Sequence, residues 1–230
     1  MKEFFQGSLF FGVCISLISY EVGVLLKKKL KLAIFNPLLI AIALTIIVLL
    51  VFDIDYATYE KSAKYLSYLL TPATVSLAIP LYEQFELLKK NWKALLAGMV
   101  SGVLASMLGV LGFAVIFKLD HASYVTLLPK SITTAIGMGV SEEMGGYVAI
   151  TVAVIIITGI IGNIFAEITC KLFRITEPVA QGIAIGSSSH AMGTARAMEM
   201  GDVQGAMSSL SIVVSGLLTV LGAMLFEHLF

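Results

Sequence analysis

The chain has 230 residues, of which 58% are hydrophobic and 13% charged, and its formal net charge is zero. A soluble domain has about a quarter of its residues charged, so this composition excludes an ordinary soluble fold. The neutral balance also gives no basis for nucleic-acid binding, and we expect no nucleic-acid partner. Cys14 and Cys170 are the two cysteines, too few for a disulfide framework or a metal site.

Five uncharged runs approach the length of about 20 residues that crosses a bilayer. They are residues 4–20, 32–52, 94–117, 147–166 and 204–226. The pattern predicts an all-α polytopic membrane protein, with residues 1–230 as one membrane domain. Within it we expect two N-terminal helices over 1–65 and a repeat-containing core over 66–230.

The first expected helix runs from about Phe4 to Leu26 and ends in a cluster of lysines at 27–29 and 31. Such a cluster in a short loop favours the cytoplasmic side. Glu21 either faces a pathway or pairs with a nearby lysine. In the second helix, 32–52, Asn36 either caps the first turn before Pro37 or contributes to a site.

The acidic loop 53–64 suits the outer side. In the next run, 65–82, Pro72 and Pro80 each remove a backbone hydrogen bond, so we expect a kinked or broken helix. A second lysine-rich loop, 83–93, is expected in the cytoplasm. The span 94–117 has a face of small residues, including Gly98 and Gly102, that is typical of close helix packing.

An exposed loop with His121 is expected over 118–128. Two segments beyond it, 129–146 and 178–203, are rich in glycine, serine and threonine although they adjoin uncharged spans. Such backbone is tolerated at membrane depth only where protein buries it or where it lines a cavity. We therefore expect the two segments to form a substrate or ion site.

A repeated pattern links these segments, Pro-x5-Ala-Ile, which begins at Pro72, Pro129 and Pro178. Repeats with broken helices meet at the binding site in many secondary transporters. With loops 27–31, 83–93 and 171–174 inside, 129–146 enters from outside and 178–203 from inside. This gives about six transmembrane helices plus two inverted re-entrant or broken-helix segments, with both termini outside.

The chemistry of the two segments suits a small carboxylate. An open helix N-terminus attracts an anion, Arg196 is able to grip a carboxylate, and His190 titrates near neutral pH. Glu142 occupies the position that matches His190, and it either pairs with His190 or carries a proton. Alternatively, Arg196 faces the cytoplasm, and Glu143 and Glu199 are interface charges. The expected substrate or ion ligands are Thr133, Thr134, Ser141, Glu142, Gly145, Gly146, Ser188, Ser189, His190, Gly193, Thr194 and Arg196. We find no catalytic constellation or metal-ligand spacing and expect neither enzyme activity nor a cofactor.

Several motifs resemble the LrgB/CidB family of bacterial membrane proteins along nearly the whole chain. They include Leu-Leu-Thr-Pro-Ala-Thr-Val-Ser-Leu-Ala-Ile-Pro before Leu81, Pro-Lys-Ser-Ile-Thr-Thr-Ala-Ile from Pro129, Ser-Glu-Glu-Met-Gly-Gly from Ser141 and Ser-His-Ala-Met-Gly-Thr-Ala-Arg-Ala from Ser189. This chain has Ala135 where the family often has proline.

The resemblance implies two competing functions. Members are described as holin- or antiholin-like regulators of murein hydrolase export and autolysis that act with a small LrgA/CidA-type membrane protein. Relatives also include pyruvate transport systems and the plastidial glycolate/glycerate translocator. The residues favour transport of a small carboxylate. Together with the resemblance, this implies a proton-coupled transporter of small monocarboxylates (pyruvate, lactate, glycolate or glycerate type) in the bacterial plasma membrane. An LrgA/CidA-type partner and a homodimer within the lipid bilayer are the expected associations.

Overall fold

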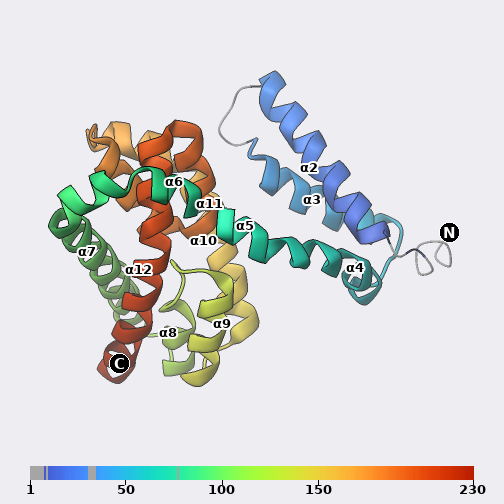
Figure 1. Cartoon of the computed structure of the whole chain (residues 1–230). Coiled ribbons are helices and arrows are strands. Elements are labelled where there is room, and N and C mark those ends of the chain that lie inside the picture. The colour runs from blue at the N-terminus through green and yellow to red at the C-terminus, as the bar shows by residue number, and fades with distance from the viewer. Residues whose placement is uncertain (1–7, 9, 31–34, 77) are drawn as a thin grey trace. The chain divides into compact units, whose positions relative to one another are not determined.

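The structure is a computed structural model that describes residues 8, 10–30, 35–76 and 78–230, and all regular elements in these ranges are helical. By contacts within the chain it divides into two compact units, Met1–Ser76 and Leu77–Phe230. Figure 1 shows the elements of both units, which are described separately below.

In the first unit, α2 (Phe11–Leu30) packs against α3 (Pro37–Val51). The side chain of Asn36 accepts hydrogen bonds from the backbone nitrogens of Leu38 at 2.9 Å and Leu39 at 3.2 Å. The capping interpretation of Asn36 is therefore confirmed, and α3 begins one residue later, at Pro37. The part of the first predicted helix before residue 8 lies outside the described residues.

The predicted loop over 53–64 is wrong, because most of it is a helix, α4 (Tyr56–Ala63). This helix packs on the start of α2, where the backbone nitrogen of Gly12 donates to Ser62 Oγ at 2.7 Å. Ser16 Oγ also lies 2.8 Å from Tyr59 Oη. The two polar contacts show that residues 53–64 fold back onto α2.

The sequence predicts a kinked or broken helix over 65–82, and the structure confirms that this run is broken. It begins in a 3₁₀ helix, Lys64–Leu69, and continues as α5 (Leu70–Ser76), which contains Pro72. Pro80 lies in α6 (Ala78–Glu83), which packs on α12 of the second unit. Residue 77 lies outside the described residues.

The second unit contains three helices that are long and apolar enough to cross a membrane, α7 (Phe85–Phe117), α10 (Val148–Leu172) and α12 (Asp202–Phe226, followed by a 3₁₀ turn to Leu229). The predicted loop 83–93 is wrong, because from Phe85 onward its residues belong to α7. In the first unit, α3 is a shorter apolar helix of 15 residues. Long apolar helices thus define a multi-pass membrane protein.

Between α7 and α10 lies a hairpin of two short helices, α8 (His121–Leu127) and α9 (Thr134–Glu143). The first replaces the predicted loop 118–128, although His121 is exposed as expected. The last turn of α8 is tied to the start of α10, because Thr126 Oγ1 accepts from the backbone nitrogen of Tyr147 at 2.7 Å. The turn of the hairpin, residues 128–133, contains Lys130 and Ser131.

The helix α11 (Pro178–Met200) is a second hairpin, because Ser189 and His190 leave the helical conformation (φ −135° and +43°). The halves on either side of this break both pack on the first part of α12. Gly182, near the start of α11, lies against Gln204, whereas Met198, near its end, lies against Gly205. The chain of α11 therefore enters and returns at the same end of α12.

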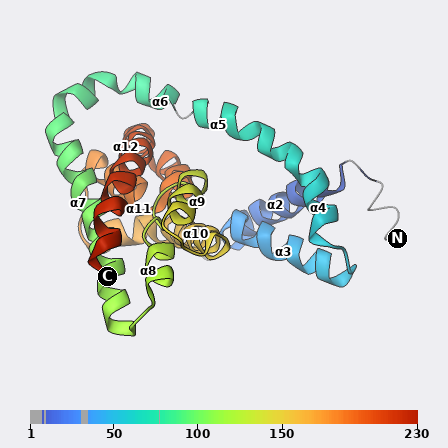
Figure 2. The same cartoon turned by 90° about the horizontal axis from the view of Figure 1, so that it is seen from below.

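The two hairpins enter the second unit from opposite ends of α12. The base of the α8–α9 hairpin lies at the C-terminal end, where Tyr124 Oη donates to the carbonyl oxygen of Phe226 at 2.8 Å. The base of α11 lies at the N-terminal end, where Gln204 Nε2 donates to Gln181 Oε1 at 3.1 Å. Figure 2 shows the second unit from below, with α9, α10 and α11 close together.

Small residues make this close packing possible, as the sequence predicts. On α12, Ser208, Ser211, Ser215 and Thr219 recur at steps of three and four residues and are all buried. On α7, a Cβ atom at Gly98 would lie 3.2 Å from Ile183 Cγ2, so α7 and α11 meet there. Farther along α7, no described atom lies within 4 Å of a Cβ built at Gly109 or Gly112, so that part of the glycine face is open.

Candidate functional site

A cavity of about 1120 Å³ lies in the second unit between α7, α10 and α11. Along α7 it extends from Asn91 to Ser106, which at 1.5 Å per residue is about 22 Å. Its wall is apolar over most of α10 and the first half of α11. Hydroxyl groups gather on it as well, from Ser101, Ser106, Ser131, Thr158, Thr169, Ser187, Ser188 and Ser189.

Lys130 is the only cation among the described residues that line this cavity. Its ammonium group donates to Ser106 Oγ at 3.0 Å and to Ser131 Oγ at 3.1 Å. Within the described chain these partners are neutral hydroxyls, and no carboxylate lies within ion-pair distance. A charge that is removed from water without a counter-ion is costly, so this position favours a bound anion.

The break in α11 supplies the opposite wall of the cavity. Ser187, Ser188 and Ser189 all line it, and Ser188 Oγ lies 3.0 Å from Ser189 Oγ. The break fits against α10 because two glycines there leave room for it. A Cβ at Gly159 would lie 2.6 Å from the His190 ring, and one at Gly162 would overlap Ser189.

Ile155 of α10 connects the two hairpins. Its carbonyl oxygen lies 3.0 Å from His190 Nε2, at the break in α11. Its side chain contacts Gly137, in the first turn of α9. Thr194 Oγ1 also donates to the carbonyl oxygen of His190 at 2.9 Å, so the polar groups at the break are bonded to protein. The turns of both hairpins therefore meet at one level of α10.

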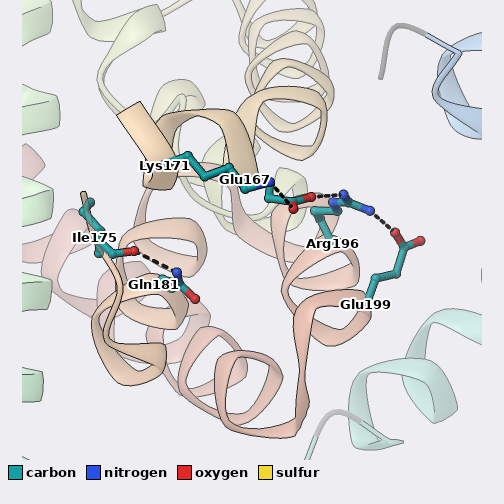
Figure 3. Close-up of polar contacts among 6 residues, drawn as sticks. All are labelled: Glu167, Lys171, Ile175, Gln181, Arg196 and Glu199. Carbon is teal, nitrogen blue, oxygen red and sulfur yellow. Dashed lines mark hydrogen bonds and ion pairs between the residues drawn. The ribbon is translucent and has the colours of Figure 1, made fainter. Parts of the chain in front are cut away.

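Arg196 lies at the other end of the second half of α11 and does not line the cavity. Its guanidinium group bonds Glu167 Oε2 and Glu199 Oε2, each at 2.5 Å, and Glu167 also pairs with Lys171 at 2.9 Å. Figure 3 shows this chain of ion pairs across α10 and α11. Because two protein carboxylates already bind its guanidinium, Arg196 is a helix-to-helix tether in this arrangement.

The cavity brings together only part of the predicted site. Ser188 and Ser189 line it, whereas His190 is buried behind the break and bonds α10. Thr133 is the N-cap residue of α9, and Glu142 is exposed at that helix's end. The remaining predicted ligands, which are also absent from the described lining, are Thr134, Ser141, Gly145, Gly146, Gly193 and Thr194.

The proposed match between Glu142 and His190 does not correspond to equivalent places in the fold. Glu142 lies near the exposed base of the first hairpin, whereas His190 is at the buried turn of the second. The proline that begins the repeat likewise differs, since Pro129 lies in a hairpin turn and Pro178 at a hairpin base. The sequence similarity of these segments is therefore not a similarity of position.

Sequence reasoning did not assign Lys130, although a signal for it exists. It is the only Lys or Arg between Lys118 and Lys171, inside a segment expected at membrane depth. An ionisable residue in such a place is a functional candidate by default. The contributions of Ser106, Ser131 and Ser187 had no such signal, because serines are common in the packing faces of this chain.

The two hairpins and the long apolar helices define a multi-pass helical membrane protein. The chain belongs to the LrgB-like family, whose pattern matches residues 16–229. It is 39% identical over 212 residues to the antiholin-like protein LrgB of Bacillus cereus strain B4264 and to that of Bacillus anthracis strain A0248. In both comparisons the match covers 92% of each chain. No solved structure matches it.

Proposed function

We propose that this protein is a carrier of small monocarboxylates and that the cavity between α7, α10 and α11 is its substrate site. The observation that supports this most directly is the position of Lys130. Its ammonium group lies among hydroxyls in a cavity where two hairpin turns meet. Among the described residues no carboxylate lies within ion-pair distance of this ammonium group, although Glu177 lines the cavity elsewhere, and a ligand that brings one negative charge suits the position.

The membrane topology in this proposal follows from the two hairpins. The helices α7, α10 and α12 cross the bilayer, and α8–α9 and α11 enter it from opposite faces as re-entrant segments. The helices of residues 1–65 and the run 65–82 supply the further crossings of a six-helix arrangement. Lys89, Lys171 and Arg174 then lie on the cytoplasmic face, as the distribution of positive charge favours.

We propose that the protein transports its substrate and does not transform it, and that it lies in the bacterial plasma membrane. We also propose that uptake is coupled to protons and that the carrier works with an LrgA/CidA-type membrane protein. A homodimer is proposed through the open glycine face of α7, at Gly109 and Gly112.

A regulatory role in autolysis is the alternative, and the names of the relatives favour it. Proteins called antiholin-like match this chain over 92% of their length. A regulator of this kind has no need of a specific ligand in the cavity. The two functions therefore differ in whether uptake is saturable and depends on Lys130.

The test is uptake of labelled pyruvate, lactate and glycolate into proteoliposomes, with and without a pH gradient. We expect saturable uptake by the wild type and its loss in Lys130→Gln, which removes the charge and keeps a hydrogen-bonding side chain. Arg196→Gln is the matched control, because its charge lies in ion pairs outside the cavity.

If Lys130→Gln retains uptake and Arg196→Gln loses it, the carboxylate binds at Arg196 and not at Lys130. Equal leakage of unrelated solutes through the wild type and both variants would overturn the carrier. Repeating the assay with an LrgA/CidA-type protein in the same vesicles tests whether the partner is required.

A further inference from the structure

Ser187 lies on α11, which faces the part of α7 that binds Lys130. Among the described residues its hydroxyl group makes only one weak hydrogen bond. Its side chain is buried, with 5% of its surface exposed, yet it lines the cavity. Its one hydrogen bond in the described structure runs to the carbonyl oxygen of Ala184 at 3.4 Å, the long limit of such contacts. A buried hydroxyl with so weak a partner has capacity to bind a ligand.

Gly102 allows Ser187 to approach α7. A Cβ atom at position 102 would lie 2.9 Å from Ser187 Oγ and 3.4 Å from its Cβ. Ser106, which binds Lys130, follows one helical turn later, about 6 Å along the axis of α7. The ammonium group is therefore bonded at the level of Ser106, and the Ser187 hydroxyl of the facing helix lies about one turn away, at the level of Gly102.

This spacing matches a ligand with two adjacent polar groups. A carboxylate bound to Lys130 at hydrogen-bond distance places the next carbon about 4 Å from the ammonium nitrogen. An oxygen on that carbon is then within reach of a hydroxyl one helical turn away. Ile183 and Ala184, which precede Ser187 on α11, form an apolar stretch of the cavity wall.

We propose that Ser187 is a specificity-determining residue that binds an oxygen on the carbon next to the substrate carboxylate, and that Gly102 keeps the space for it. The inference rests on the proposed carrier function. The proposal predicts that the carrier binds a 2-hydroxy acid more tightly than the same acid without the hydroxyl group. Lactate and propionate are such a pair.

The experiment measures how unlabelled lactate and propionate compete with labelled lactate for uptake in proteoliposomes. We expect the wild type to prefer lactate, and Ser187→Ala to reduce that preference by about five- to tenfold through weaker lactate binding, the usual effect of one hydrogen bond. Competition by propionate should not change. Ser209→Ala is the matched control, because Ser209 is also 5% exposed but bonds within α12, outside the cavity.

Gly102→Ala gives a second test, since its methyl group would narrow the space beside Ser187. If Ser187→Ala does not assemble, Ser187→Cys keeps the shape of the side chain with a slightly larger atom and weakens the hydrogen bond. An unchanged lactate-to-propionate preference in an assembled Ser187 variant overturns this inference and leaves the carrier intact. Absence of saturable lactate uptake in the wild type is the distinct result that removes both.

Discussion

The break in α11 packs directly against Gly162 of α10, so a side chain added at Gly162 should destabilise the protein. A Cβ atom at this position would overlap the Cβ of Ser189. Because a Cβ atom is fixed by its backbone, rotation of the serine side chain cannot relieve the contact, and the break itself must move. Gly162→Ala therefore tests whether the hairpin turn is held in place by the absence of a single methyl group.

Two opposing effects determine how much Gly162→Ala changes the free energy of unfolding. Replacing glycine by alanine inside a helix stabilises it by about 1 kcal/mol. Forcing an extra carbon into a packed interface costs about 1–3 kcal/mol, and a contact with a fixed Cβ belongs at the upper end. We expect Gly162→Ala to be less stable than the wild type by about 2 kcal/mol.

Gly139→Ala, inside α9, is the control, because no described atom lies within 4 Å of its added carbon. It should gain the helical stabilisation of about 1 kcal/mol without a packing cost. Thermal unfolding in detergent should then separate the two variants by about 6–12 °C, given about 2–4 °C per kcal/mol for a chain of this size. Equal melting temperatures for the two variants would refute the close contact of α10 with the break.

Three further predictions concern the same region. His190→Ala removes the contact with the Ile155 carbonyl oxygen and should lower stability by about 1–3 kcal/mol, measured by thermal unfolding; a smaller loss than for His121→Ala, an exposed histidine, would contradict it. Glu167→Gln weakens a partly exposed ion-pair chain, so stability should change by about 1 kcal/mol or less and saturable uptake should persist; loss of uptake with intact assembly would give this chain a direct role. Ser188→Cys in a protein without Cys14 and Cys170 should react with a thiol reagent more slowly when lactate is present, followed by mass spectrometry; equal rates would exclude ligand contact at that position.

The broad architecture was predictable because each long helix has its own local signal. Uncharged runs marked α7, α10 and α12, and glycine- and serine-rich composition marked α11 and the second half of the α8–α9 hairpin, whereas α8 was expected to be a loop. Helix ends were less predictable. Lys89, Lys90 and Lys93 suggested a loop, but lysine is a good helix former, and α7 begins before them at Phe85.

The site was harder to predict because it depends on contacts between distant residues. Arg196 looked available for a substrate, but its partner Glu167 is 29 residues away, and only the packing of α10 on α11 brings them together. Lys130 was in a segment identified as functional, yet its hydroxyl partner on α7 is 24 residues away. Composition located the segments, and tertiary contacts decided which of their side chains meet.

The shape of the cavity bears on the choice between a carrier and a pore. An open pore needs a polar passage through the whole bilayer. Here the cavity ends at the α8–α9 turn, and beyond it Met107, Val110, Tyr124 and Val125 belong to a continuous apolar core. A passage to the other face requires the turn or the core to move. Movement of this hairpin turn is therefore the step that we expect alternating access to a bound anion to require.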